Sequence, residues 1–163
     1  GGGAILDTGC YCTSFALLLA NLKDNSSDSI NFKFTDVSAT VNRRNVEDFA
    51  EAKVVFENNF FANLKTSFKK KLENNLIIYG TDGNIIVSNP WFPEEKSYIE
   101  INNKNNKYKR TIESDYSIGV NTIKVISNLI KDNQREAQFP FMSWKDSLNN
   151  MKMIDEWKKQ VIK

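Results

Sequence analysis

The residues best placed to do chemistry stand at the beginning of the chain, where Asp7 and Tyr11 follow the glycine triplet at positions 1–3. Four residues apart on a helix, a carboxylate and a phenol share one face, one turn apart. A phenol next to a carboxylate can hold or move a proton, so this pair is a candidate proton-handling site. The structural alternative is that Tyr11 packs its ring at a helix edge with its hydroxyl in water. Asp7 would then be a solvated first-turn charge, favoured by the helix dipole.

The element that must position this pair is a predicted helix that begins among the glycines. Its apolar residues recur at helical spacing: Ile5, Leu6, Phe15, Leu18, Leu19 and Leu22. The glycines do not form a dinucleotide fingerprint, which requires a preceding strand and G-x-G-x-x-G spacing. Their expected role is close backbone approach, where the helix start meets a cofactor or another domain. Because no initiator Met precedes the glycine triplet, we expect the sequence to be a piece of a longer protein.

Strand patterns dominate the middle of the chain. Residues 48–57 alternate, with Ala50, Ala52, Val54 and Phe56 on one side. Residues 60–70 repeat the pattern with Phe60, Ala62, Leu64 and Phe68, and the intervening Asn58-Asn59 predicts a hairpin turn. Further strands are predicted near 32–41, 76–79, 85–87, 97–102 and 107–113, with Gly80 and Gly83 as turn residues.

Two helical patterns close the chain. Apolar residues three or four apart predict one helix with Tyr116, Val120, Ile123, Ile126 and Ile130. They predict a second with Trp144, Leu148, Met151, Ile154, Trp157 and Val161, capped by Ser143 and Asp146. Together the elements predict an α+β fold, in which helices pack on one face of a large, predominantly antiparallel open sheet.

Composition limits the function classes. The 163 residues suit one domain with a single core. Lys and Arg number 22 against 20 Asp and Glu, which is too balanced to imply a nucleic-acid partner, and we see no apolar run of the ~20 residues that a membrane span needs. The absence of His removes His-based acid–base chemistry and most zinc sites, so no metal is expected. Cys10 and Cys12 point to different sides of a helix, so they cannot form a disulfide with each other. We expect them to be reduced thiols of a cytoplasmic protein.

Two separated motifs carry a family resemblance. GGGAILDTGCY at residues 1–11, followed by TSFALLLA, resembles the opening of the C-terminal domain of the Gfo/Idh/MocA oxidoreductases. IIYGTDGNIIVSNPWFP at residues 77–93 is similar to that family's YGTxGxxxxxNPxxP hairpin, and the likeness continues to the closing helix at residues 143–161. The members it most resembles carry Tyr where many others carry His: trans-1,2-dihydrodiol dehydrogenase, D-xylose dehydrogenase and glucose–fructose oxidoreductase.

The resemblance implies a function and a cofactor. Residues 1–163 would be the C-terminal substrate-binding and oligomerisation domain, preceded in the whole protein by a Rossmann domain that binds NAD or NADP. Hydride would pass between the nicotinamide and a carbinol carbon of a small-molecule substrate, which is a sugar, polyol or dihydrodiol. In Tyr-bearing members the tyrosine that matches Tyr11 is the general acid, tuned by a lysine of the other domain, and Asp7 would support it. The fragment alone is expected to be inactive.

The resemblance also suggests a substrate contact and an interface. Trp91 lies in an aromatic loop that Pro90 and Pro93 make rigid, and it could stack on a sugar or ring; the alternative is a plug over the sheet edge. Arg43 and Arg44 end a predicted strand and are exposed charges by default. Paired arginines resemble those of dihydrodiol dehydrogenases, whose sheet forms the subunit interface. A homodimer or higher homo-oligomer through the open sheet face is therefore expected.

Two alternatives remain from the residues. One is a non-catalytic ligand-binding or self-association module that has no nucleotide partner. The other is a member of the same family that keeps the fold but lacks the catalytic lysine. The substrate, the choice between NAD and NADP and the direction of the reaction do not follow from this sequence.

Overall fold

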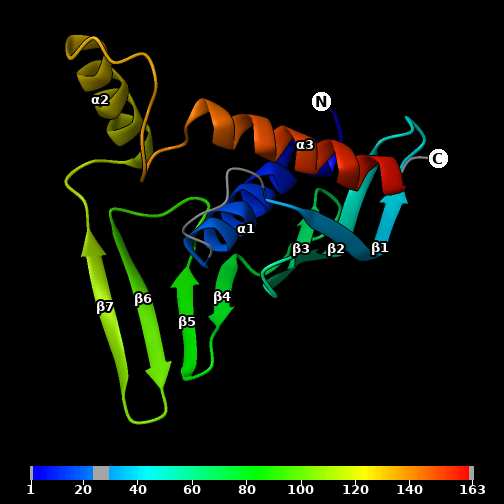
Figure 1. Cartoon of the computed structure of the whole chain (residues 1–163), viewed down its shortest axis with the longest axis horizontal. Coiled ribbons are helices and arrows are strands. Elements are labelled where there is room, and N and C mark those ends of the chain that lie inside the picture. Colours follow the sequence, from blue (N-terminus) through cyan, green and yellow to red (C-terminus); the bar gives the residue numbers. More distant parts are fainter. Residues whose placement is uncertain (1, 24–29, 162–163) are drawn as a thin grey trace. The chain divides into compact units, whose positions relative to one another are not determined.

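The computed structural model describes residues 2–23 and 30–161, which form two compact units. Unit 1 comprises Gly1–Leu72 and Ala137–Lys163, and unit 2 comprises Glu73–Glu136 (Figure 1). The sequence suggested a single core, whereas each unit has a sheet of its own.

Unit 1 is a three-stranded antiparallel sheet with helices on one face (Figure 1). The sheet order is β1-β2-β3. The strands are β1 (Phe32–Val41), β2 (Glu47–Phe56) and β3 (Phe61–Ser67). The helical segments are η1 (Ile5–Gly9), which continues directly into α1 (Cys10–Lys23), and α3 (Trp144–Val161). Segment η1 packs on β3, α3 packs on β1, and α1 and α3 pack against each other.

The core of unit 1 lies between this helix layer and one face of the sheet. The inward sheet residues are Phe34, Ala50, Ala52, Val54, Phe56 and Leu64. The predicted inward side of residues 48–57 is therefore confirmed. Trp157 of α3 is fully buried and stacks on Phe34, with ring centroids 5.8 Å apart. The prediction that Phe68 faces inward was wrong: β3 ends at Ser67, so Thr66 takes the last inward position and Phe68 is 56% exposed.

In both α1 and α3, the residues buried against the sheet and the other helix differ from the apolar stripe that the sequence predicts. In α1 the buried residues are Thr13, Ala16, Leu17 and Ala20, while Leu22 is exposed. In α3 they are Asn150, Met153, Ile154 and Trp157, while Trp144, Leu148 and Met151 are exposed. The reason is the same in both helices: small or polar residues occupy the positions of closest packing, and a count of large apolar residues passes over them.

The first helix also meets the criteria for a membrane span. Ile5–Lys23 has 19 residues and a mean hydropathy of 1.3, so it is long and apolar enough to cross a membrane, although the sequence reading found no such stretch. Length and composition do not distinguish a membrane span from a core helix. In this structure Ala16, Leu17 and Ala20 are buried against the rest of unit 1, so the segment serves there as a core helix.

Unit 2 is a four-stranded antiparallel sheet of order β4-β5-β6-β7 with one helix. Its elements are β4 (Asn75–Tyr79), β5 (Gly83–Ser88), β6 (Lys96–Asn103), β7 (Lys107–Glu113) and α2 (Ile118–Lys131). The β4–β5 turn is closed by the Gly80 N–H, which donates to the Gly83 carbonyl oxygen at 2.8 Å, so both glycines flank the turn as predicted. Gly83 is also the first residue of β5, where a Cβ atom would lie 1.9 Å from the Asn102 carbonyl oxygen of β6. All residues of 73–136 are described, and none is buried.

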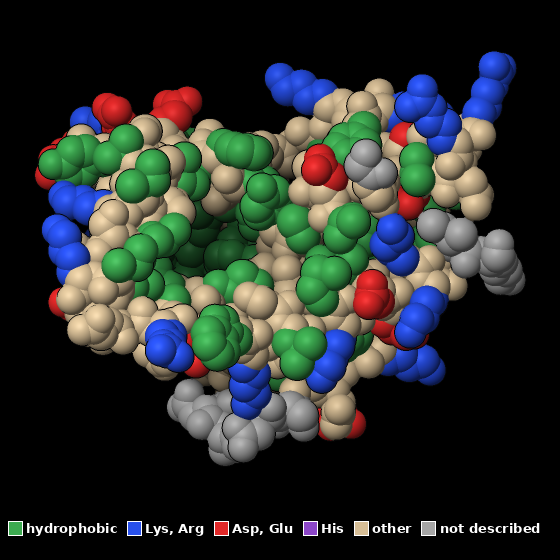
Figure 2. Space-filling view, turned by 90° about the horizontal axis from the view of Figure 1, so that it is seen from above, with side chains coloured by type: hydrophobic (Ala, Val, Ile, Leu, Met, Phe, Trp, Pro, Cys, Tyr) green, Lys and Arg blue, Asp and Glu red, His purple; other side chains and the backbone are tan. Residues whose placement is uncertain are grey.

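The predicted α+β class with antiparallel strands and helices is confirmed. The strands that the sequence suggests as one open sheet hydrogen-bond as two. The apolar stripe of the first of the two predicted closing helices is present in α2, but its isoleucines are exposed among the described residues. Figure 2 shows that hydrophobic side chains reach the surface among charged ones on the face seen from above.

Candidate functional site

Asp7 and Tyr11 lie where two kinds of helix join. Asp7 is in the five-residue π-helical turn η1, and Tyr11 is the second residue of α1. Both residues are exposed, Tyr11 to 44%. Single π turns inserted in α-helices are rare and occur often at functional sites. The predicted arrangement of a carboxylate and a phenol about one turn apart at the surface is therefore compatible with this structure.

A buried carboxylate holds the beginning of this helix. The Ile5 N–H donates to Glu47 Oε1 at 3.0 Å, and Glu47, at the start of β2, is fully buried. On the other side of the glycine segment, Lys158 Nζ donates to the Gly2 carbonyl oxygen at 2.8 Å. The first N–H groups of a helix lack partners inside it, so these contacts fix the segment from two sides.

The glycines lie close to side chains of the same chain, and at Gly3 the backbone also has a positive φ. A Cβ atom at Gly2 would lie 2.4 Å from Leu6 Cδ2, and one at Gly3 would lie 2.3 Å from the carboxyl carbon of Glu47. At Gly3 the backbone therefore does approach another group closely, and that group is Glu47 of the same unit. Gly1 lies outside the described residues.

Two hydroxyl groups hold the next turn. The Ala4 carbonyl oxygen accepts hydrogen bonds from Thr8 Oγ1 at 3.2 Å and from Thr66 Oγ1 of β3 at 3.1 Å. The two hydroxyl oxygens are themselves 2.5 Å apart. These contacts tie η1 to the sheet directly beneath it.

An asparagine of α3 holds the turn that carries Tyr11. Thr13 Oγ1 donates to Asn150 Oδ1 at 2.6 Å, and Asn150 Nδ2 donates to the Cys10 carbonyl oxygen at 3.2 Å. Thr13 is fully buried and Asn150 nearly so. Buried, satisfied polar contacts of this kind fix one arrangement of side chains, because breaking them leaves polar groups without partners. The backbone on both sides of Tyr11 is therefore fixed.

The two cysteines beside Tyr11 are free thiols, as predicted. Burial, with a smaller contribution from the neighbouring Cys10, raises the pKa of Cys12 to about 11. Burial also raises the pKa of Cys10, with a smaller contribution in the same direction from the charge of Asp7. Because the thiolate is the nucleophilic form, neither thiol is activated, and the site's chemistry does not rest on them.

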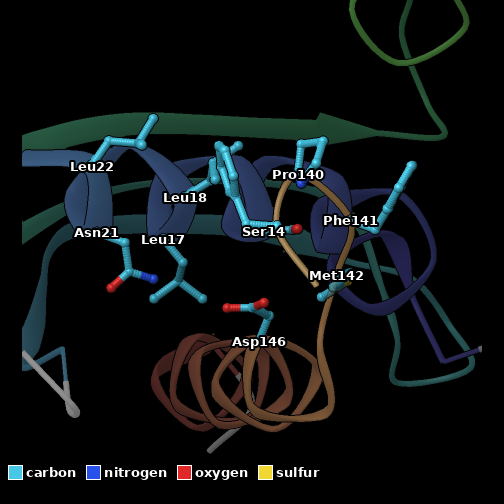
Figure 3. A pocket seen from close by; sticks show the side chains of 10 residues that line it. Ser14, Leu17, Leu18, Asn21, Leu22, Pro140, Phe141, Met142 and Asp146 are labelled. Carbon is cyan, nitrogen blue, oxygen red and sulfur yellow. The ribbon is translucent and has the colours of Figure 1, made fainter. Parts of the chain in front are cut away.

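An apolar pocket of about 290 Å³ opens along α1 beyond Tyr11 (Figure 3). It lies within unit 1, between α1, the segment 139–142 and the start of α3. Its lining comprises Ser14, Leu17, Leu18, Asn21, Leu22, Phe139, Pro140, Phe141, Met142 and Asp146. Ser14 and Leu18 follow Tyr11 by three and seven residues, which places them on the same side of the helix.

The other predicted site residues lie elsewhere. Trp91 belongs to unit 2, in the loop after β5, where Asn89 Nδ2 donates to the Phe92 carbonyl oxygen at 2.6 Å and shapes the loop. Arg43 is exposed in the turn between β1 and β2, which the Asn42 N–H closes on the Val46 carbonyl oxygen at 2.9 Å. Asp7 and Tyr11 are thus on one helical segment of unit 1, Arg43 is in a turn of the same unit, and Trp91 is in the other unit.

The described residues do not form a nucleotide-binding fold of their own. Among residues 2–23 and 30–161 every strand pairing is antiparallel, whereas a dinucleotide site requires parallel βαβ units. The space beside Gly3 is taken by Glu47, so that glycine offers no phosphate cradle. The same residues contain no group of three or more Cys, Asp or Glu side chains able to hold a metal ion.

The sequence analysis missed three features of this site. Glu47 is an acidic residue at the start of a strand, where nothing in the sequence indicated that it would be buried. Asn150 is a polar residue outside the predicted apolar stripe, yet it is buried with Met153 and Ile154. The pocket had a visible signal, because the run Phe139-Pro140-Phe141-Met142 is strongly apolar and stands directly before the Ser143–Asp146 cap. That cap is confirmed: Ser143 Oγ donates to Asp146 Oδ2 at 2.6 Å and accepts from the Asp146 N–H at 3.1 Å.

Three solved structures share this fold. One is the 3-ketoreductase KijD10 from Actinomadura kijaniata in complex with TDP-benzene and NADP, with a TM-score of 0.75 and 19% identity, covering 96% of this chain and 46% of that chain. Another is an aldose-aldose oxidoreductase from Caulobacter crescentus complexed with glycerol, with a TM-score of 0.70 and 14% identity, covering 97% and 45%. A third is an NAD binding oxidoreductase from Klebsiella pneumoniae, with a TM-score of 0.70 and 13% identity, covering 99% and 49%.

The chain spans about half the length of each of these structures. No curated protein matches its sequence. The profile of the GFO/IDH/MocA C-terminal domain matches residues 1–86, which include η1, α1, the whole sheet of unit 1 and the first strand of unit 2. The chain therefore belongs to the GFO/IDH/MocA family of oxidoreductases, as a C-terminal domain.

Proposed function

We propose that the chain is the substrate-binding domain of an NAD(P)-dependent oxidoreductase in which Tyr11 is the general acid and base. The observation that carries this proposal is the presentation of Tyr11. Its side chain is 44% exposed, while the backbone before and after it is held by buried polar contacts through Glu47 and Asn150. A proton donor needs this combination of access and fixed geometry.

The names of similar structures support the reaction class. KijD10 is a 3-ketoreductase seen with NADP, and the Caulobacter crescentus protein is an aldose-aldose oxidoreductase. We propose that the nicotinamide and a tuning lysine belong to a Rossmann domain in the whole protein, because this chain spans only about half of those structures and its described strands contain no parallel unit. Bound there, the nicotinamide supplies or accepts the hydride.

In this proposal the residues of the chain manage the proton. The Tyr11 hydroxyl gives its proton to the oxygen of the carbonyl that is reduced, or takes the proton of the carbinol in the reverse direction. Asp7, one turn earlier and also exposed, accepts a hydrogen bond from the substrate and orients it toward the phenol. The substrate is a sugar, polyol or dihydrodiol, whose hydroxyl groups suit such an acceptor.

The decisive experiment is Tyr11→Phe in the full-length protein. The substitution keeps the ring and removes only the hydroxyl, so we expect kcat to fall by roughly 10²–10⁴-fold if the phenol is the acid. Turnover would be followed as NAD(P)H absorbance over a panel of aldoses, nucleotide sugars and dihydrodiols. Tyr108→Phe, at an equally exposed tyrosine of β7, is the matched control and should leave kcat unchanged. An unchanged rate in Tyr11→Phe would remove the phenol from the mechanism, and no turnover by the parent over the whole panel would favour a non-catalytic module.

Trp91 is proposed to contact the substrate from its loop after β5. The loop is shaped by the Asn89 hydrogen bond, and an indole face suits a sugar or an aromatic ring. Trp91→Ala should therefore raise KM by about 10-fold while changing kcat less, because stacking holds substrate and transition state alike. The steady-state constants of the full-length variant test this. A fall in kcat with KM unchanged would contradict it.

We also propose that the protein self-associates through the outward face of the sheet of unit 1, with Arg43 in the β1–β2 turn at one end of that sheet. That face carries apolar side chains among polar ones: Phe61 is 58% exposed and Val55 is 39% exposed. Lys53 Nζ lies over the Phe61 ring at 5.0 Å, a mixture that suits a symmetric, partly polar interface. Phe61→Lys should shift the full-length protein to a smaller species in sedimentation velocity. Tyr79→Lys, at an exposed aromatic residue of unit 2, is the control and should not.

A further inference from the structure

We propose that Glu47 is the positioning residue for Tyr11, in that its buried carboxylate fixes the start of the helix on which Tyr11 stands. The consequence for activity rests on the proposed role of Tyr11. The structural part, a specific fit between Glu47 and the backbone at Gly3 and Ile5, can be tested without any activity.

The first observation is the contact itself. Glu47 Oε1 accepts the Ile5 N–H at 3.0 Å, and Ile5 is the first residue of η1. The N-cap residue Ala4, which precedes it, makes no side-chain capping hydrogen bond. Helix N-termini leave N–H groups without internal partners and favour negative charge. Glu47 thus supplies, from a distant strand, the acceptor that the local sequence lacks.

The second observation is the shape of the glycine segment. A Cβ atom at Gly3 would lie 2.3 Å from both Cδ and Oε1 of Glu47, and Gly3 has a φ of +90°. An L-residue would therefore meet both a collision and an unfavourable backbone conformation. The backbone runs directly over the carboxylate, so the carboxylate and the glycine fit each other.

The third observation is that Glu47 is a costly residue for stability alone. It is 0% exposed, and its Oε2 has no hydrogen-bond partner among the described residues. A buried polar atom without a partner costs free energy, and an apolar side chain of similar volume would avoid that cost. What Glu47 provides is the placement of Ile5, and this explains a carboxylate here better than stability does.

Placement at Ile5 passes directly to Tyr11. The two residues are six apart on a continuous helical segment, which is about 9 Å along a helix axis. A misplacement of about 1 Å at a reacting group can cost on the order of 100-fold in rate. A small shift of the helix start is therefore enough to affect proton transfer.

The first test uses the full-length protein and the apolar variant Glu47→Leu. We expect kcat to fall about 10- to 100-fold with KM little changed and the melting temperature nearly kept, and Glu47→Gln, which retains an acceptor for the Ile5 N–H, to recover most of kcat. In a Tyr11→Phe background, Glu47→Leu should change kcat by less than about 2-fold, because its effect passes through the phenol. Glu51→Leu on the same strand is the control and should leave kcat unchanged in both backgrounds.

The outcomes separate the two proposals. If Tyr11→Phe has no effect, the proposed function fails, whatever Glu47 does. If Tyr11→Phe is slow but Glu47→Leu is as active as the parent, or lowers kcat equally in both backgrounds, the positioning role is overturned.

A second test needs no activity and covers a Glu47→Leu variant that does not fold. Gly3→Ala should lower the melting temperature by about 5 °C or more in the parent, because the new Cβ meets the carboxylate. In a Glu47→Ala background the collision is gone and only the strain of the positive φ remains, so the same substitution should lower the melting temperature by clearly less. Equal losses in both backgrounds would show that Gly3 and Glu47 are not fitted to each other, and the proposal would fail.

Discussion

Unit 1 and unit 2 differ most in what they bury. Unit 1 has a continuous core that includes fully buried Trp157, Phe56 and Ile154, together with buried polar Glu47, Thr13 and Asn150. Residues 73–136, all of them described, contain no buried residue, and the isoleucines of α2 are exposed within the chain. Fixed polar groups require burial, so the candidate proton-handling residues stand where the chain can hold them still. Unit 2 offers strand pairing and open surface instead, and we expect it to be the less stable of the two on its own.

The largest effect should come from removing the same side chain in each unit. Ile154 is 1% exposed and Ile126 is 51% exposed. Ile154→Ala leaves a cavity and should destabilise unit 1 by about 2–5 kcal/mol, whereas Ile126→Ala should change stability by no more than about 0.5 kcal/mol. Chemical denaturation of the two variants measures both values. Similar losses of stability in the two variants would mean that Ile126 is buried in the folded protein in solution. The difference in burial between the two units would then be smaller than this structure shows.

A smaller effect is expected from the buried amide. Asn150→Ala removes the acceptor of the Thr13 hydroxyl and the donor to the Cys10 carbonyl oxygen, and should cost about 1–3 kcal/mol. Asn121 is the matched residue of α2, where its amide donates to Ser114 Oγ at 2.8 Å near solvent. Asn121→Ala should cost less than about 1 kcal/mol, because water replaces the lost partner. Thermal unfolding of both variants tests the difference, and an equal cost would argue against a special role for burial in unit 1.

The pH dependence of unit 1 should carry a signature of Cys12. Burial raises its pKa from 9.0 to about 11, so the folded state holds the thiol proton where the unfolded state loses it. The resulting stabilisation is complete below pH 9 and is lost as the pH rises toward 11. Between pH 8 and pH 10 it should fall by about 1 kcal/mol.

Denaturation at both pH values, repeated with Cys12→Ala, measures this contribution. The alanine variant should lose stability less steeply over that interval. An identical slope would show that the thiol reaches water in the folded protein.

The smallest effects should be those of surface ion pairs, and here the units should not differ. Lys65 and Glu51 lie 3.0 Å apart in unit 1, and Lys96 and Glu113 lie 2.9 Å apart in unit 2, all with exposed side chains. Lys65→Gln and Lys96→Gln should each cost less than about 1 kcal/mol.

The ion pair of unit 1 has a second readout. The hydrogen bond from Lys65 lowers the pKa of Glu51, so its contribution exists at neutral pH and is lost as the pH falls below the ordinary carboxyl range. Lys65→Gln should raise that pKa toward its usual value in an NMR titration. An unchanged Glu51 pKa would show that the pair does not form in solution.

Strand periodicity predicted the sheet of unit 1 well, because alternation on β2 directly reports its one buried face: Ala50, Ala52, Val54 and Phe56 are all inward. Helix stripes were predicted less well, since Thr13 and Asn150 are core residues for the hydrogen bonds they make and not for their hydropathy. Tyr11 and Asp7 were predicted as candidate proton-handling residues from their spacing and from the family resemblance. Glu47 was not, because its importance arises from a contact between positions 5 and 47, and separation in sequence hides such pairs.

The π-helical turn at Ile5–Gly9 has a consequence for how this domain tolerates change. Such a turn accommodates one more residue than an α-helical turn does, which makes it the natural place for a single-residue deletion. Losing one residue there would restore regular α-helical winding with little rotation of the flanking residues, because five residues of a π turn and four of an α-helix wind through about the same angle. The glycines over the Glu47 carboxylate and the phenol of Tyr11 would therefore keep their relative placement, whereas the same deletion in the regular part of α1 would rotate the residues on either side of it by about 100° relative to each other.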